Sequence, residues 1–286
     1  MPAWRLSDAE LSAYREDGLV APVLRLPAEL LGQMRGALER LLAANPELAP
    51  EGLVCPHIPN GKPGGAEAAA EWFGFCSNPA ILDLVEQVLG PDIILWGSQV
   101  FCKPARVGRA VPWHQDGKYW PMRPLATCSV WIALDAATPE NGCLRYIPGS
   151  HRAGSLYEHR QVRQKNVVLA QEVIGSLFDG SQARDDVLEA GQFSLHDVFL
   201  IHGSDANRSH QRRAGFVIRY MPASSVFERD LPGLASGSQQ PLVAFDFTRR
   251  PIWLLRGRDT SGRNDFAVGH DEVYRLVPRA SDEEYG

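Results

Sequence analysis

The sequence lacks the features of several protein classes. It has no apolar run of about 18 residues that could cross a bilayer, and its first residues, MPAWRLSDAELSAY, have no basic segment followed by an apolar stretch. Lysine and arginine (29) are fewer than aspartate and glutamate (34), which leaves a net charge of −5. We therefore expect a cytoplasmic protein whose partners are neither membranes nor nucleic acid.

Cysteine is also scarce and badly placed for cross-linking. The five cysteines are odd in number and widely spaced, so they predict neither a disulfide framework nor a zinc cluster, which would need close pairs. Hydrophobic residues, by contrast, make up 44% of the chain and aromatic residues 9%. This composition is sufficient for a large buried core.

Helical patterns dominate the first third of the chain. SDAELSAYREDG, residues 7–18, has serine at an N-cap position, glutamate three residues later and glycine at the end. Amphipathic segments over 27–46 and 79–89 predict two more helices.

After residue 90 the pattern changes to short β-type runs separated by turns. These runs are DIILWGSQVFC, TCSVWIALD, GCLRYIP, GQFSLHDVFLIH and GFVIRYMP. We expect a mainly β protein with N-terminal helices, in which a sandwich or jelly-roll barrel is backed by the helices. The predicted organisation is one domain over 1–286, with a helical layer at about 1–90, a barrel core at about 91–222 and an irregular C-terminal extension at about 223–286.

The stretch VPWHQDGKYWP, residues 111–121, places a histidine and an aspartate two positions apart. On an extended strand, His114 and Asp116 would lie on the same face, as two of the three ligands of a 2-His-1-carboxylate iron site. So short a motif is weak evidence by itself, and His270 with Glu272 forms a similar pair that no further histidine follows.

A second histidine and an arginine follow at a suitable place. In IHGSDANRSHQRRAGFVIRY, His202 ends an apolar run, and Arg213 opens the next strand eleven residues later. Arginine binds carboxylates through a planar fork and keeps its charge, so Arg213 suits the distal carboxylate of a keto acid, and Ser204 offers a further hydrogen bond.

Together, these segments resemble the phytanoyl-CoA dioxygenase family of Fe(II)- and 2-oxoglutarate-dependent oxygenases. The resemblance runs to about Pro222 and rests on WHQDG, ENGCLRYIPGSH and HGSDANRSHQRR. It implies a double-stranded β-helix that uses Fe(II), 2-oxoglutarate and O2.

The resemblance also implies roles for individual residues. His114, Asp116 and His202 would be the iron ligands and catalytic residues, and Arg213 with Ser204 would hold the C5 carboxylate of 2-oxoglutarate. Lys103 would be a further polar co-substrate contact. Halogenating relatives have a small residue in place of the aspartate, so Asp116 favours hydroxylation.

Other residues near the motif are candidates for contact with a small-molecule substrate. They are Trp113, Lys118, Tyr119, Trp120 and Arg219, although each could equally serve the core or the surface. His196 fits a structural hydrogen bond better than metal ligation. The sequence does not indicate the substrate or the oligomeric state.

Two other functions remain open. One is a metal-dependent cupin-type enzyme without 2-oxoglutarate, which Arg213 disfavours. The other is a non-catalytic jelly-roll binding module, which the complete set of candidate ligands disfavours.

Overall fold

The computed structural model describes residues 3–58, 68, 70–162, 166–231 and 247–270. Its helices are α1 (Asp8–Asp17), α2 (Ala28–Ala44), α3 (Glu71–Cys76) and α4 (Pro79–Leu89). Its longer strands are β3 (Ile93–Lys103), β6 (Cys128–Ala133), β11 (Phe193–Asp197) and β13 (Arg213–Pro222). The shorter strands are β1 (Leu19–Val20), β2 (Leu53–Val54), β4 (Val111–His114), β5 (Met122–Arg123), β7 (Leu144–Tyr146), β8 (His159–Gln161), β9 (Gln171–Val173), β10 (Arg184–Asp186), β12 (His202–Ser204), β14 (Val226–Phe227) and β15 (Trp253–Arg256).

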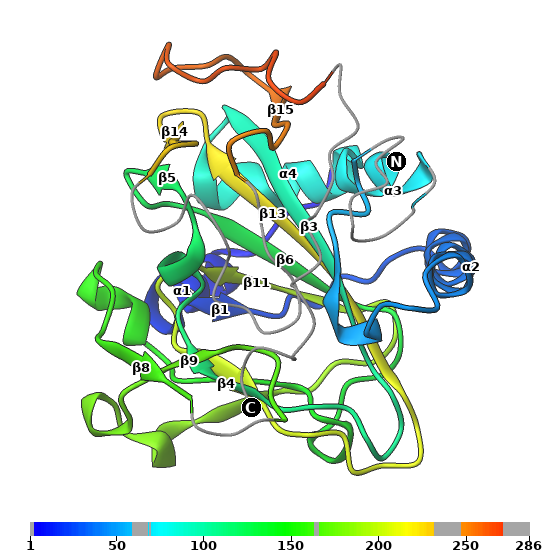
Figure 1. The fold of residues 1–286 in the computed structure, drawn as a ribbon. Coiled ribbons are helices and arrows are strands. Elements are labelled where there is room, and N and C mark those ends of the chain that lie inside the picture. The colour runs from blue at the N-terminus through cyan, green and yellow to red at the C-terminus, as the bar shows by residue number, and fades with distance from the viewer. Residues whose placement is uncertain (1–2, 59–67, 69, 163–165, 232–246, 271–286) are drawn as a thin grey trace, which may run out of the picture.

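Two antiparallel sheets form the framework of the described residues. The larger sheet has the order β1-β11-β6-β13-β3-β15, with β2 also pairing with β3, and the smaller has the order β10-β7-β12-β4. Figure 1 shows α4 and β4 on opposite sides of the larger sheet. The prediction of a mainly β jelly-roll core with N-terminal helices is confirmed.

The N-terminal helices form where their capping signals predict them. Ser7 and Glu10 make a reciprocal capping box at the start of α1, and Gly18 ends it in the left-handed conformation (φ 82°). Asn78 caps α4, whose first residue is Pro79. The short α3 was missed by the sequence analysis.

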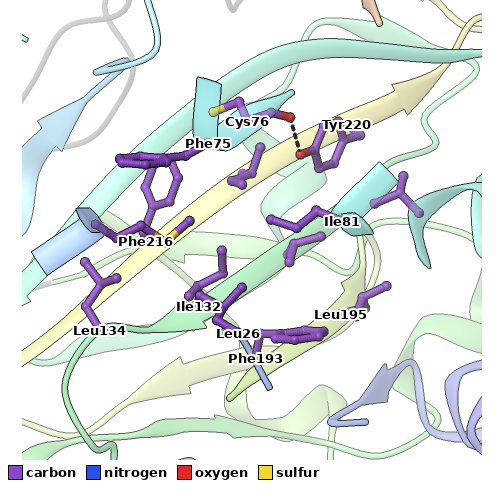
Figure 2. Close-up of a cluster of buried hydrophobic side chains, with 14 of the residues drawn as sticks. Leu26, Phe75, Cys76, Ile81, Ile132, Leu134, Phe193, Leu195, Phe216 and Tyr220 are labelled. Atoms are coloured by element: carbon purple, nitrogen blue, oxygen red, sulfur yellow. Dashed lines mark hydrogen bonds between the residues drawn. The ribbon is translucent and has the colours of Figure 1, made fainter. Parts of the chain in front are cut away.

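The main hydrophobic core lies between these helices and one face of the larger sheet. Figure 2 shows Phe75 of α3 and Ile81 of α4 beside Ile132, Phe216 and other buried side chains of the strands. Because side chains alternate along a strand, the opposite face of β6 and β13 is free to form a second compartment.

The apolar run GQFSLHDVFLIH forms two strands instead of one. β11 ends at Asp197, whose carboxylate accepts a hydrogen bond from the Phe199 amide at 2.8 Å. The chain then passes from the larger to the smaller sheet, where β12 begins at His202. A local aspartate turn therefore breaks a segment that its hydrophobicity alone predicts as continuous.

The C-terminal extension contributes to the larger sheet through β15, which pairs with β3. Residues 232–246 and 271–286 of this extension lie outside the described part of the chain, so the single-domain assignment stays a prediction. None of the helices among the described residues has both the length and the apolar character needed to cross a bilayer.

Candidate metal centre and co-substrate site

Three side chains from separate points of the fold converge at one end of the smaller sheet. His114 is the last residue of β4, His202 is the first of β12, and the two are paired across the sheet. Asp116 Oδ1 lies 3.4 Å from His114 Nε2 and 3.9 Å from His202 Nε2. One ligand atom from each of the three residues lies within 4.8 Å of the others, so they can hold one metal ion.

The backbone around this motif differs from the prediction. Asp116 does not continue the strand but begins a 3-10 turn over Asp116–Tyr119. The turn still directs its carboxylate toward His114. The predicted convergence therefore occurs, but by a change of backbone direction instead of strand alternation.

Backbone carbonyls fix the orientation of both imidazoles. His114 Nδ1 lies 2.9 Å from the carbonyl oxygen of Pro112, and His202 Nδ1 lies 3.0 Å from that of Leu200. Because Nδ1 donates to a carbonyl, Nε2 presents its lone pair to the centre. Burial lowers the pKa of His202 to about 3, which keeps this ring neutral.

Asp116 supplies the negative charge of the cluster. Burial by itself would raise the pKa of Asp116, but the neighbouring His114, His196 and His202 rings, together with the positive charge of Arg219, outweigh it and hold the pKa well below its usual value. Two imidazole nitrogens and one carboxylate oxygen match the donor set of a facial Fe(II) site.

His196 contacts the other oxygen of the same carboxylate. Its Nε2 lies 3.5 Å from Asp116 Oδ2, and only 2% of the residue is exposed. It comes from β11 of the larger sheet, whereas His202 comes from β12 of the smaller one. This arrangement favours the positioning role over a place among the ligands, because His196 approaches the oxygen that faces away from His114 and His202.

The residues predicted to bind 2-oxoglutarate also lie together. Arg213 is paired with Lys103 across β13 and β3, and Lys103 Nζ donates a hydrogen bond to Ser204 Oγ at 2.7 Å. Lys103 also donates to the carbonyl of Asp205. The strand register thus places Arg213 beside Lys103, and the Lys103 side chain links this pair to Ser204 of the smaller sheet.

The guanidinium of Arg213 has spare hydrogen-bonding capacity. It is 3% exposed, and its Nη2 donates to the Gly142 carbonyl at 2.8 Å. Its Nε has no partner among the described residues, and its central carbon lies 5.4 Å from the Trp131 ring centroid. A buried cation with an unpaired donor is suited to receive a carboxylate, which fits 2-oxoglutarate.

Burial controls the charge of Lys103. It lowers the pKa of this residue to about 6, with a further contribution from Arg213. Lys103 is therefore mainly neutral at pH 7, and Arg213 carries the positive charge of this group.

One cavity connects the two clusters. The space between its walls is about 610 Å³ when the part open to solvent is included. Its lining residues are Phe101, Val111, His114, Asp116, Tyr119, Trp131, Leu144, Leu169, His196, His202, Gly203, Ser204, Arg213, Val217 and Arg219. Its walls are thus largely apolar, with the polar groups concentrated at a few points.

The structure places the predicted substrate contacts in different surroundings. Tyr119 and Arg219 line the cavity. Trp120 is buried beneath Arg219, whose guanidinium lies 5.3 Å from the ring centroid. Trp113 packs against Phe178 outside this cavity, and Lys118 is half-buried and not part of the lining.

Some cavity residues were not found by the sequence analysis. Trp131 and Leu169 line the wall although neither lies near a motif. Strand alternation in β6 is the signal for Trp131, because Val130 and Ile132 on either side of it belong to the main core. Of the second histidine–glutamate pair, His270 contacts the Ile252 carbonyl and Trp253, whereas Glu272 lies outside the described residues.

The profile of the phytanoyl-CoA dioxygenase (PhyH) family matches residues 14–215. The chain belongs to this family. It is 29% identical to the peroxisomal phytanoyl-CoA dioxygenase of Bos taurus over 212 residues, which are 67% of this chain and 60% of that protein. It is also 30% identical to the L-proline trans-4-hydroxylase of Streptomyces griseoviridis over 190 residues, or 60% of this chain and 71% of that one.

Solved structures show the same fold. Apo ThoJ, a non-heme monooxygenase, is 26% identical with a TM-score of 0.67, covering 89% of this chain and 86% of ThoJ. CytC3 with Fe(II) and α-ketoglutarate is 20% identical with a TM-score of 0.64, and the match covers 97% of this chain and 99% of CytC3. The PhyH family uses Fe(II) and 2-oxoglutarate, as the resemblance implied. The chain spans about 60% of the length of the bovine and human relatives that it matches.

Proposed function

We propose that this protein is an Fe(II)- and 2-oxoglutarate-dependent dioxygenase that hydroxylates a small molecule and releases succinate and CO2. The observation that supports it best is the shared cavity, which is lined both by the His114, Asp116 and His202 cluster and by Arg213. A metal-binding cluster and a carboxylate-binding cation in one cavity are the two elements that this chemistry requires.

Each residue has a distinct task in this proposal. His114, Asp116 and His202 hold iron, and Arg213 binds the distal carboxylate of 2-oxoglutarate while Ser204 adds a hydrogen bond to it. Lys103 holds the Ser204 hydroxyl in place. Iron, when bound, supplies the redox chemistry for O2 that no side chain here can supply.

The protein orients the reactants and excludes water. The fixed imidazoles and the His196 contact to Asp116 set the position of the ligands before the metal arrives. Apolar walls such as Leu169 and Val217 keep the substrate close to the metal in a dry site. Asp116 would supply a carboxylate ligand to the iron where halogenating relatives have a small residue, which favours hydroxylation over halogenation.

The substrate is proposed to be a small molecule. Among the relatives, the L-proline hydroxylase has an amino acid as its named substrate, and the phytanoyl-CoA dioxygenases have an acyl-CoA. Of the residues suggested for substrate contact, Tyr119 and Arg219 are best placed. Trp120 would act indirectly by packing under Arg219.

Anaerobic titration with Fe(II) and 2-oxoglutarate tests the proposal, followed through the visible metal-to-ligand charge-transfer band. We expect the band in wild type, its loss in His202→Ala, and a need for much more 2-oxoglutarate in Arg213→Ala. His270→Ala is the matched control, because this histidine does not line the cavity, and it should keep the wild-type band.

The competing functions give different results. A cupin-type enzyme without 2-oxoglutarate would retain turnover in Arg213→Ala, and a binding module would show no band in wild type at any concentration. Either outcome contradicts the proposed function.

A further inference from the structure

Strand β13 presents two arginines to the cavity. Arg213, Val217 and Arg219 line it, while Phe216 and Ile218 point into the main core on the other face. Six residues of extended chain separate the two arginines, about 20 Å between their Cα atoms. The two cations therefore lie near opposite ends of one strand face.

Arg219 lacks a carboxylate partner of the kind that Arg256 has. It is 8% exposed, its Nη2 donates to Gln99 Oε1 at 3.3 Å, and its Nε has no partner among the described residues. No ion pair joins it to a carboxylate within the described part of the chain. Arg256, by contrast, contacts Asp83 at 3.0 Å and Glu86 at 2.6 Å although it is more exposed.

A second arginine approaches Arg219 from a neighbouring segment of the chain. A Cβ added at Gly97 would lie 3.8 Å from the Arg219 side chain and 4.0 Å from Arg250 Nη1, so the two arginines approach the same glycine. Burial lowers the pKa of Arg219, with Asp116 acting in the opposite direction. Asp116 is the main negative influence on this guanidinium.

When Fe(II) and 2-oxoglutarate are bound, the negative charge of Asp116 is already neutralised. The two positive charges of Fe(II) and that of Arg213 cancel the charges of Asp116 and of dianionic 2-oxoglutarate. The charge of Arg219 is then left without compensation in a largely apolar cavity, which is unfavourable unless another anion binds.

We propose that the primary substrate is a carboxylate with an apolar body, and that Arg219 binds its carboxylate group. This inference rests on the proposed function and names the substrate class of the same site. A single guanidinium with a planar fork and one uncompensated charge matches a monovalent carboxylate. Tyr119, Leu169 and Val217 supply apolar surface for the rest of the molecule.

Hexanoate and its neutral analogue hexanamide serve as probes. Each is titrated by calorimetry into the anaerobic full-length protein with Fe(II) and saturating 2-oxoglutarate, so that the Arg213 site is filled. Wild type is expected to bind hexanoate at least tenfold more tightly than hexanamide. Arg219→Gln should abolish this preference, and Arg219→Lys should keep part of it.

Arg212→Gln is the matched control. Arg212 comes directly before Arg213 in the sequence, but it pairs with Glu39 and Asp135 and does not line the cavity. This variant should retain the wild-type preference for hexanoate. The charge-transfer band is recorded on every sample, which reports whether the iron and 2-oxoglutarate site is intact.

Several results would overturn the inference. The first is that wild type shows no preference for hexanoate, or binds neither probe. The second is that the preference survives in Arg219→Gln. The third is that Arg219→Gln binds 2-oxoglutarate more weakly than wild type. If the band forms normally in wild type, these results leave the proposed function standing. If wild type forms no band, the proposed function itself fails.

Discussion

Replacing Lys103 by methionine should change the pH dependence of stability in a defined way. Lys103 is 1% exposed, and burial lowers its pKa from 10.5 to about 6. Between these two values the unfolded chain binds a proton that the folded protein does not. The unfolding free energy therefore rises with pH across this window. Below about pH 6, the destabilisation caused by burying Lys103 has reached its full size.

The size of the effect follows from the shift. Each pKa unit corresponds to about 1.4 kcal/mol, so neutralising Lys103 costs about 5 kcal/mol at pH 7 and about 2 kcal/mol at pH 9. Methionine removes this cost but leaves the oxygen atoms of Ser204 and Asp205 without their donor, which costs about 1–3 kcal/mol for each. These losses do not depend on pH.

The difference between variant and wild type is therefore the quantity to measure. Urea unfolding at pH 7, 8 and 9, followed by tryptophan fluorescence, should show that the unfolding free energy of Lys103→Met, relative to wild type, falls by about 3 kcal/mol from pH 7 to 9. Gln99→Met changes a buried, uncharged residue of the same strand and should give a constant difference. A constant difference for Lys103→Met would refute the reasoning, because it would mean that Lys103 remains charged in the folded protein.

Three further substitutions test other contacts. His196→Ala should raise the Fe(II) concentration for half-formation of the charge-transfer band about tenfold, and an unchanged value would exclude a positioning role through Asp116. Gly215→Ala should lower the unfolding free energy by about 1–3 kcal/mol, because the new Cβ would lie 2.2 Å from the Trp131 ring. It should also weaken 2-oxoglutarate binding, because the Trp131 ring packs on Arg213, the proposed carboxylate ligand; wild-type values in both titrations would contradict this. Tyr220→Phe should cost about 1–2 kcal/mol in urea unfolding, since its buried hydroxyl donates at 2.7 Å to the last carbonyl of α3, and no loss would show that this bond contributes nothing.

Local signals in the sequence were sufficient for helices α1 and α4 and for the first half of the metal cluster. The serine and glutamate of the capping box define the start of α1, and Pro79 defines that of α4. Such signals act over three or four residues, so they can be recognised without knowledge of the fold. The spacing of His114 and Asp116 is of the same kind.

Residue chemistry and the family resemblance together supplied the more distant partners. Both associated His202 and Arg213 with the His114 and Asp116 motif, and the structure brings all four to one cavity. The detail of the backbone still differed, because Asp116 lies in a turn and not on the strand. A short pattern defines which residues are near one another, but several backbone paths satisfy it.

The tertiary structure alone decided which distant residues meet. The contact of His196 with Asp116 depends on the break after β11. Arg219 has no carboxylate in an ion pair with it among the described residues, and this depends on how the surrounding strands pack. The pairing of Lys103 with Arg213 likewise depends on the register of β13 against β3. These relations result from strand register and sheet packing between residues 80 or more positions apart, and no local preference of the chain encodes them.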